Sequence, residues 1–213
     1  MFVVVYWILL ALGHKISGAH YNPAITLACM FRLNVGRFSR LLGILYIVCQ
    51  FAGVFWGALL AFLFTRSGGD LEIEDDKHTF QAMVIEALGS FFYITVFLIN
   101  TEPSSRFFEE RSLNLLAIAA AYGCAITFST KLAGGSMNPA YGFSVNFTML
   151  MDTGEGKTLK WIWLYLTMPF VGTVFALIFH EFIFKKTQEG IDKIERRQSE
   201  YEPPPAVNDL DQD

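Results

Sequence analysis

The sequence predicts an all-α membrane protein built as an inverted repeat, with five full transmembrane helices and two re-entrant half-helices. Hydrophobic residues make up 53% of the chain, with a mean hydropathy of +0.39, which is high for a soluble domain. These residues gather into long apolar segments. The tripeptide Asn-Pro-Ala occurs twice, each time after a glycine-containing turn at the end of an apolar segment.

Five apolar segments are interpreted as membrane spans. They are residues 1–13, Leu41–Phe64, Phe80–Ile99, Leu113–Thr130 and Trp161–Phe184. A full span needs about 20 residues, so the first segment is short by itself. No cleavable signal peptide is expected, because Met1 leads directly into an apolar run without a charged leader.

Each Asn-Pro-Ala motif predicts the start of a short helix, because Asn is a preferred N-cap and Pro a preferred first helical residue. A capped helix start at membrane depth presents free N–H donors and partial positive charge to whatever lies in front of it. One such motif is weak evidence, but two at corresponding points of the half-chains are specific. The two motifs consist of Asn22, Pro23 and Ala24, and of Asn138, Pro139 and Ala140.

An odd number of full spans lets the two half-helices enter the bilayer from opposite faces, so that their N-termini meet near the midplane. Asn22 and Asn138 would then lie side by side and donate to a passing solute, with the backbone carbonyls of residues 17–21 and 133–137 as acceptors. Lys and Arg are concentrated on the face from which the first half-helix enters, which predicts that this face is inside. We therefore expect a multi-pass integral protein of a plasma, vacuolar or mitochondrial membrane.

The segments "SGAHYNPAITLA" and "GGSMNPA" resemble the major intrinsic protein family, the aquaporins and glycerol channels. The resemblance covers about residues 1–184, which we interpret as an aquaporin-like transmembrane domain. Residues 185–213 are charged, then Pro-rich, then acidic, and predict a short polar helix and a disordered tail. The resemblance implies a channel for passive transport of water or a small neutral solute, assembled as a homo-oligomer (a tetramer) in the lipid bilayer. It implies no enzymatic activity and no cofactor.

The sequence departs from the family pattern in two places. The family has six full spans and two half-helices, whereas five full spans are predicted here, and the first is the one not found. Counting from the two Asn residues places the narrow filter at Phe2, Ile126, Gly135 and Tyr141, and Tyr141 stands where the family has an Arg. These departures support an alternative: a pore-degenerate, aquaporin-like structural subunit of a larger membrane protein complex, for example a mitochondrial one.

Glu86 is an ionisable residue inside the predicted span Phe80–Ile99. Such a group is costly in a bilayer and faces protein or water. It is either a proton or ion site, or a structural acceptor for the backbone N–H groups of the second half-helix loop. The family resemblance favours the structural role.

Several other classes of site are not indicated. The net charge of −4 suggests no nucleic-acid surface, and the four His show no metal-ligand spacing. Cys29, Cys49 and Cys124 lie in apolar runs and are expected to be small buried hydrophobes. His180 and Glu181, near the end of the last span, are expected at the membrane interface.

Overall fold

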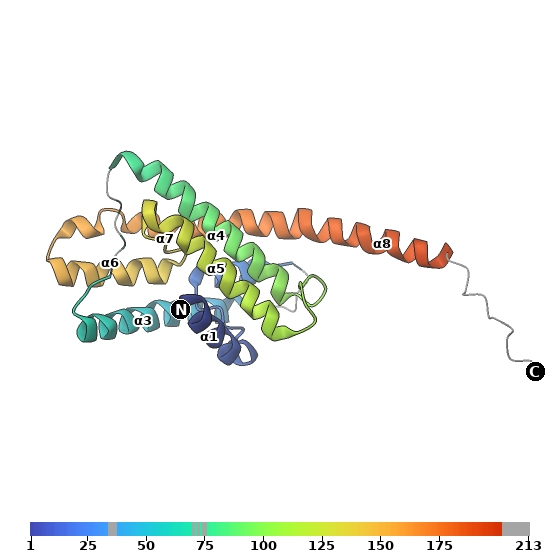
Figure 1. Ribbon diagram of the computed structural model, residues 1–213, viewed down its shortest axis with the longest axis horizontal. Helices are drawn as coiled ribbons and strands as arrows, with labels where there is room; N and C mark the ends of the chain where they lie inside the picture. The colour runs from blue at the N-terminus through green and yellow to red at the C-terminus, as the bar shows by residue number, and fades with distance from the viewer. Residues whose placement is uncertain (34–37, 70, 72, 74–75, 202–213) are drawn as a thin grey trace, which may run out of the picture.

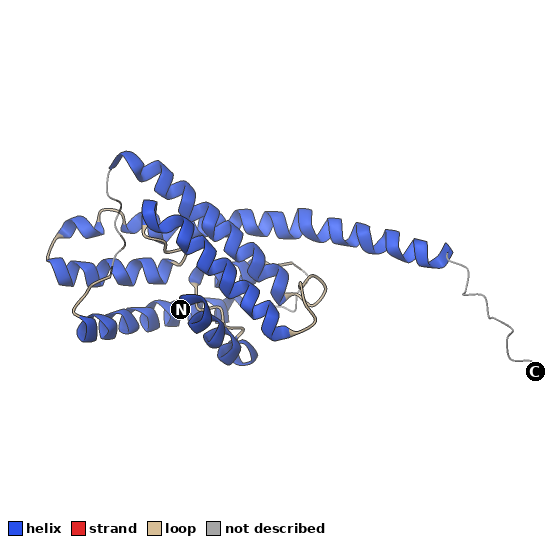
Figure 2. Ribbon diagram, viewed as in Figure 1, coloured by secondary structure: helices blue, strands red, loops and turns tan. Residues whose placement is uncertain are grey.

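The computed structural model describes residues 1–33, 38–69, 71, 73 and 76–201, and their regular structure is entirely helical (Figure 2). This confirms the all-α class. The end of the polar tail, residues 202–213, and part of the acidic loop between residues 66 and 78 lie outside the described residues.

The first half of the chain forms three helices: α1 (Phe2–Ser17), α2 (Pro23–Phe31) and α3 (Arg40–Thr65). Gly18 follows α1 with a left-handed backbone, φ 79°, which ends the helix and turns the chain toward α2. The Ser39 hydroxyl caps α3 by accepting from the backbone N–H of Leu42 at 3.5 Å.

The second half repeats this order after one additional helix. Its elements are η1 (Asp76–His78), α4 (Thr79–Thr101), α5 (Arg111–Ala133), α6 (Pro139–Thr153), η2 (Gly156–Leu159) and α7 (Ile162–Ile178). Gly134 ends α5 with a left-handed backbone, φ 68°, as Gly18 ends α1. Each half therefore contains a longer helix, a left-handed glycine and a shorter helix that begins at a proline.

The helix of the last predicted span continues beyond Phe184 into the predicted polar helix. α7 continues through a π-helical segment, η3 (Phe179–Phe184), into α8 (Lys185–Tyr201). No Gly or Pro occurs from Ile178 to Lys185, so nothing in the local sequence ends the helix. The polar helix is thus continuous with the span, and it extends away from the bundle (Figure 1).

Four helices in the described part of the chain are long and apolar enough to cross a membrane: α3, α4, α5, and α7 with its extension. α1 has 16 residues. It is therefore about 24 Å long at 1.5 Å per residue, shorter than a hydrocarbon core of about 30 Å. The five predicted spans correspond to these four helices and one shorter apolar helix.

α4 lies at the centre of the bundle, where it packs along both α5 and α7 (Figure 1). Half of the most apolar stretch of α4 is buried within the protein. α3 packs against α6 and α2, but Gly43 is the only residue of this helix that is buried. α3 therefore presents an apolar surface outward, as a helix facing lipid or another membrane helix does.

The expectation that all three cysteines are buried is wrong for two of them. Cys49 on α3 and Cys124 on α5 are exposed, and Cys29 on α2 is half-buried. The physical reason is that lipid is as apolar as a protein core, so an apolar run in a membrane helix does not say which side faces inward.

Candidate functional site

Both Asn-Pro-Ala motifs begin helices whose first turns are capped by the Asn side chain. The Oδ1 atom of Asn22 accepts from the backbone N–H of Ala24 at 2.8 Å at the start of α2. The Oδ1 atom of Asn138 accepts from the backbone N–H of Ala140 at 3.1 Å at the start of α6. Each cap satisfies one of the N–H groups that a helix start leaves without an intrahelical partner.

The two caps are joined by a reciprocal pair of hydrogen bonds. Nδ2 of Asn22 donates to the carbonyl oxygen of Met137 at 2.9 Å, and Nδ2 of Asn138 donates to the carbonyl oxygen of Tyr21 at 3.1 Å. Tyr21 and Met137 each precede an Asn and each have a positive φ, 49° and 47°. Left-handed backbone is unusual for bulky residues, so the junction holds both loops in equivalent, constrained shapes.

Glu86 from α4 anchors the second of these loops. Its Oε1 accepts from the backbone N–H of Ser136 at 2.9 Å and from the Ser129 hydroxyl at 2.8 Å, while its Oε2 accepts from the backbone N–H of Met137 at 2.9 Å. The Glu86 side chain is completely buried. The carboxylate thus satisfies backbone donors that the irregular loop would otherwise leave unpaired at this depth.

Three of the backbone carbonyls predicted as solute acceptors already have protein partners. The Ser136 oxygen accepts from the Tyr122 hydroxyl at 3.0 Å. The Tyr21 and Met137 oxygens accept from the Asn amides across the junction. Each of these three oxygens therefore has one of its two lone pairs occupied by a side chain from α5 or from the opposite loop, and a solute would bind the other.

The structure describes all four positions predicted as a filter, and they come from α1, α5, the loop before Asn138 and α6. A Cβ atom added to Gly135 would lie 2.8 Å from the carbonyl oxygen of Ile126, so these two residues are in close contact. Tyr141 lies in the first turn of α6 and is 41% exposed, and Phe2 opens α1 and is 49% exposed. The structure brings Ile126 and Gly135 together and leaves the two aromatic positions half open.

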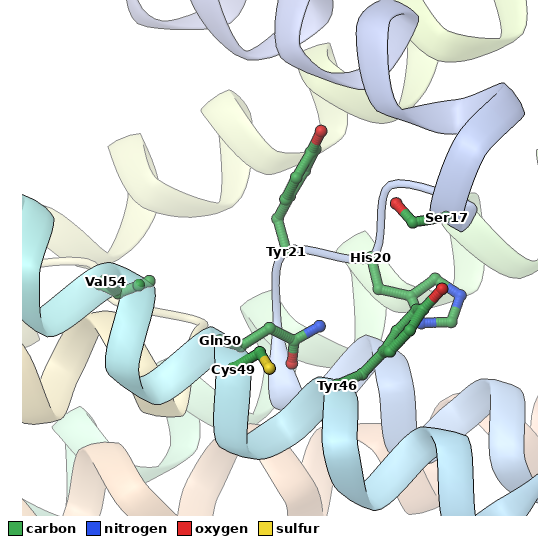
Figure 3. Close-up of a pocket in the computed structure, with 8 residues that line it drawn as sticks. Ser17, His20, Tyr21, Tyr46, Cys49, Gln50 and Val54 are labelled. Carbon is green, nitrogen blue, oxygen red and sulfur yellow. The ribbon is translucent and has the colours of Figure 1, made fainter.

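A cavity of about 330 Å³ lies between α3 and the loop that precedes Asn22 (Figure 3). His20 from the loop lies beside Tyr46 of α3, and Cys49 and Gln50 of α3 also line the cavity. The Tyr21 side chain, in contrast, points away from α3 and donates to the Leu9 carbonyl oxygen of α1 at 3.1 Å. The Gln50 amide donates to the Thr26 hydroxyl at 2.9 Å, and His20 Nδ1 lies 3.2 Å from the same hydroxyl.

This polar group was not predicted from the sequence. Gln50 is an amide in the middle of the apolar run Leu41–Phe64, and a polar residue in a span usually faces protein or a cavity. The polar side chain of Gln50 within an apolar span was therefore the sequence feature that could have predicted this polar group.

A second polar cluster connects the ends of α2 and α4 to η3 and the start of α8. Glu102 Oε2 lies 2.9 Å from an Arg32 nitrogen and 3.1 Å from Lys185 Nζ. His180 Nε2 lies 3.5 Å from the same oxygen, and Glu181 pairs with Lys185 at 3.0 Å. His180 and Glu181 are both buried, because the helix continues past them and they pack with Glu102 and Lys185; their position at the membrane interface stays a prediction.

The charge balance at Glu102 favours its ionised form. Burial by itself raises the pKa of this carboxyl, but the hydrogen bonds and charges of Arg32 and Lys185 outweigh burial. The net result is that the pKa of Glu102 lies below its ordinary value.

An all-helical bundle in which two short helices point their N-termini at each other is characteristic of membrane proteins that bind or pass a solute near the midplane. Comparison with known proteins agrees with this class. The sequence profile described as Major intrinsic protein matches residues 1–180, so the chain belongs to the major intrinsic protein family. The family consists of channels rather than enzymes, and the chain is an integral membrane protein.

Individual relatives match the chain at low sequence identity. The chain is 27% identical over 180 residues to "Probable aquaporin TIP2-2" of Oryza sativa subsp. japonica, covering 84% of this chain and 67% of that protein. It is 27% identical over 179 residues to Aquaporin-4 of Bos taurus, covering 81% of this chain and 51% of the relative. The chain thus spans about half the length of Aquaporin-4.

The fold is also similar to a solved structure. The X-ray structure of the aquaglyceroporin from Plasmodium falciparum superimposes with a TM-score of 0.71 at 18% identity, covering 88% of this chain and 81% of that one. At this identity the likeness shows the fold alone.

Proposed function

We propose that this chain forms an aquaporin-like channel for passive transport of water or a small neutral solute. The observation that carries the proposal is the reciprocal contact between Asn22 and Asn138 at the N-termini of α2 and α6. Each amide has two donor hydrogens and uses one across the junction. The proposal assigns the second hydrogen to an oxygen atom of a passing solute.

The same arrangement favours neutral solutes over cations. The N-terminus of a helix carries roughly half a positive charge, and α2 and α6 direct theirs to one point. A cation at the junction would face both positive ends, whereas water or a polyol would find hydrogen-bond donors. In this proposal Glu86 is a structural acceptor that keeps the second loop in position, since three donors already occupy its two oxygens.

The filter in this proposal consists of Phe2, Ile126, Gly135 and Tyr141. It is apolar apart from one phenol, and it lacks a fixed positive charge. We therefore expect a weaker barrier to cations than a filter containing arginine would give. Tyr141→Arg should lower any cation leak relative to water flux, whereas Tyr141→Phe, which adds no charge, should not.

We further propose that residues 1–184 form the transmembrane domain, with α1 as a fifth span and α2 and α6 as half-helices. The charged helix α8 and the residues after it would then lie outside the bilayer, on the side of the Glu102 cluster. This arrangement places the two half-helix N-termini near the midplane, as an inverted repeat requires.

The outward surface of α3 supports a second candidate function. This apolar helix buries only Gly43, so in a membrane it contacts lipid, another copy of the chain or a helix of another protein. A homo-oligomer, a tetramer, is the assembly expected of the channel. A structural subunit of a larger complex is the alternative, and the mass of the assembly extracted from native membranes in mild detergent separates the two.

Osmotic shrinkage of proteoliposomes tests the channel directly. After a step in osmolarity, vesicles with folded protein should respond faster than empty vesicles. An impermeant solute in the bath measures transport of water. A permeant, glycerol-sized solute measures transport of that solute. The channel proposal fails if the wild type, and also a variant with a widened interior, shrinks no faster than empty vesicles.

A further inference from the structure

A cluster of aromatic side chains lies between the predicted filter and the Asn junction. Tyr6 follows Phe2 by four residues on α1, and Tyr122 precedes Ile126 by four residues on α5. Residues four apart share one face of a helix and are separated by slightly more than one turn, about 6 Å along the axis. Tyr6 and Tyr122 therefore lie on the same faces as two filter positions, one turn deeper.

On both helices, the step from the filter position to the tyrosine leads from the filter toward the Asn junction. α1 runs from Phe2 toward the loop that carries Asn22, so Tyr6 is closer to the junction than Phe2. α5 ends at Ala133, close to the filter end, so Tyr122 is farther from that end than Ile126. The Tyr122 hydroxyl reaches the carbonyl oxygen of Ser136, two residues before Asn138.

The rings fill the space in which they meet. The centroids of Tyr6 and Tyr122 are 5.0 Å apart, those of Tyr93 and Tyr122 are 4.6 Å apart, and Phe2 covers Tyr122 at 5.5 Å. Such separations are those of aromatic pairs in van der Waals contact. Tyr6, Tyr93 and Tyr122 are 8%, 0% and 7% exposed, so a water molecule has no room to pass between them.

The hydroxyl groups are also engaged within the protein. Tyr6 and Tyr93 share a hydrogen bond of 2.5 Å, and Tyr122 donates to Ser136 at 3.0 Å. The Tyr122 hydroxyl in addition lies against the Asn138 side chain. The solute would need the Asn138 amide as a donor and the Ser136 carbonyl as an acceptor. The Tyr122 hydroxyl occupies both, so a solute entering from the filter end would have to displace it.

We propose that Tyr6, Tyr93 and Tyr122 form an aromatic plug that closes the conduit between the filter and the Asn junction. This inference rests on the proposed channel function. It assigns Tyr122 the central part, because this ring contacts both other tyrosines and its hydroxyl holds the second loop. The conformation described by the structure is then the closed one, and passage requires the Tyr122 ring to leave its place.

The test compares single substitutions at one position in proteoliposomes. Tyr122→Val removes the ring, and Tyr122→Phe keeps the ring but removes the hydroxyl. Each sample is first checked for folding by its size-exclusion profile and thermal melting in detergent. Osmotic shrinkage of Tyr122→Val should be at least about tenfold faster than that of the wild type, which corresponds to lowering the barrier by about 1.4 kcal/mol. Tyr122→Phe should remain within about twofold of the wild type on the same scale.

The outcomes separate the plug from the channel. If the wild type and Tyr122→Val conduct equally above empty vesicles, the channel stands and the plug is overturned. If Tyr122→Phe conducts as fast as Tyr122→Val, the ring does not close the path and the plug is overturned as well. If the wild type and both variants, all folded, match empty vesicles, the channel function itself is overturned.

A second measurement does not depend on Tyr122→Val folding. Ile126→Cys, in a background whose three native cysteines are replaced by alanine, is exposed to a membrane-impermeant thiol reagent from either face. With the plug in place, Cys at this position should react only from the face where α1 begins. Equal reaction from both faces, with all three tyrosines present, would overturn the proposal.

Discussion

The side-chain amide of Asn22 donates to the carbonyl oxygen of Met137 at 2.9 Å, across 115 residues of sequence. The equivalent bond runs from Asn138 to Tyr21. Because each Asn also caps its own helix, a single residue type performs three tasks: it starts a helix, joins the two halves and presents a donor at the junction.

Asn22→Ala should be strongly destabilising. It removes an N-cap worth about 1 kcal/mol and leaves the buried Met137 carbonyl without its partner, which adds about 1–3 kcal/mol. Thermal or denaturant unfolding in detergent measures the loss. The exposed N-cap variant Ser39→Ala is the matched control and should cost about 1 kcal/mol or less. Equal losses for the two variants would contradict a role for Asn22 beyond capping.

Glu86→Gln should be more damaging than its small change in shape suggests. The Gln side chain has one acceptor oxygen, so one of the backbone N–H groups of Ser136 and Met137 would face an NH₂ group. A buried donor left unpaired costs about 1–3 kcal/mol. Ser129→Ala removes only the hydroxyl donor to the same carboxylate and should cost less in the same unfolding assay. The reverse order would show that Glu86 does not hold the loop.

Glu102 should make stability depend on pH in the acid range. The pKa of its carboxyl is lowered in the folded protein from an ordinary value of 4.5, so its stabilising effect is complete above that value. The effect is lost as the pH falls below 4.5 toward the folded-state pKa. Glu102→Gln should therefore lower the melting temperature at neutral pH, by the equivalent of about 3 kcal/mol for a buried ion cluster.

The difference in melting temperature between the wild type and Glu102→Gln should narrow between about pH 4.5 and pH 3. Glu109 provides the control, because its side chain is 97% exposed in its pair with Arg106. Glu109→Gln should change stability by less than about 1 kcal/mol at any pH. A wild-type advantage over Glu102→Gln that persists unchanged at pH 3 would argue against the ion cluster.

Gly135→Ala should destabilise the second loop. Gly135 has φ +78°, which L residues adopt at a cost, and its new Cβ would approach the Ile126 carbonyl oxygen to 2.8 Å. We expect a loss of about 1–3 kcal/mol. Gly156, where an added Cβ meets nothing within 4 Å, is the control, and Gly156→Ala should be nearly neutral. A neutral Gly135→Ala would mean that the loop relaxes freely at this position.

Local rules account for much of the fold. The starts of α2 and α6 follow from Asn and Pro, since capping and the fixed φ of proline act within a few residues. The long apolar helices follow from the hydropathy of their own residues, which can be read without knowing what each helix contacts in the folded protein. Hydropathy did not predict that the last span and the polar helix after it form one continuous helix, because the change from apolar to polar composition at Lys185 contains no helix-breaking residue.

Contacts between distant segments could not be predicted in this way. Tyr6, Tyr93 and Tyr122 come from three helices, and nothing in their own segments indicates that their rings meet. Likewise Arg32 and Glu102 are 70 residues apart, and nothing in the sequence near His180 and Glu181 indicates that both are buried beside Glu102 and Lys185.

Composition and local motifs are enough to predict the class of protein, the places where the two short helices begin and the presence of one acid inside a span. The folded structure is needed to learn which donor meets which acceptor across the junction, that Glu86 holds the loop before Asn138, and that three tyrosines lie in contact beside it. The reason is physical. Helix starts and hydropathy depend on neighbours in the chain, whereas these contacts depend on the packing of helices that bring remote residues within a few ångströms.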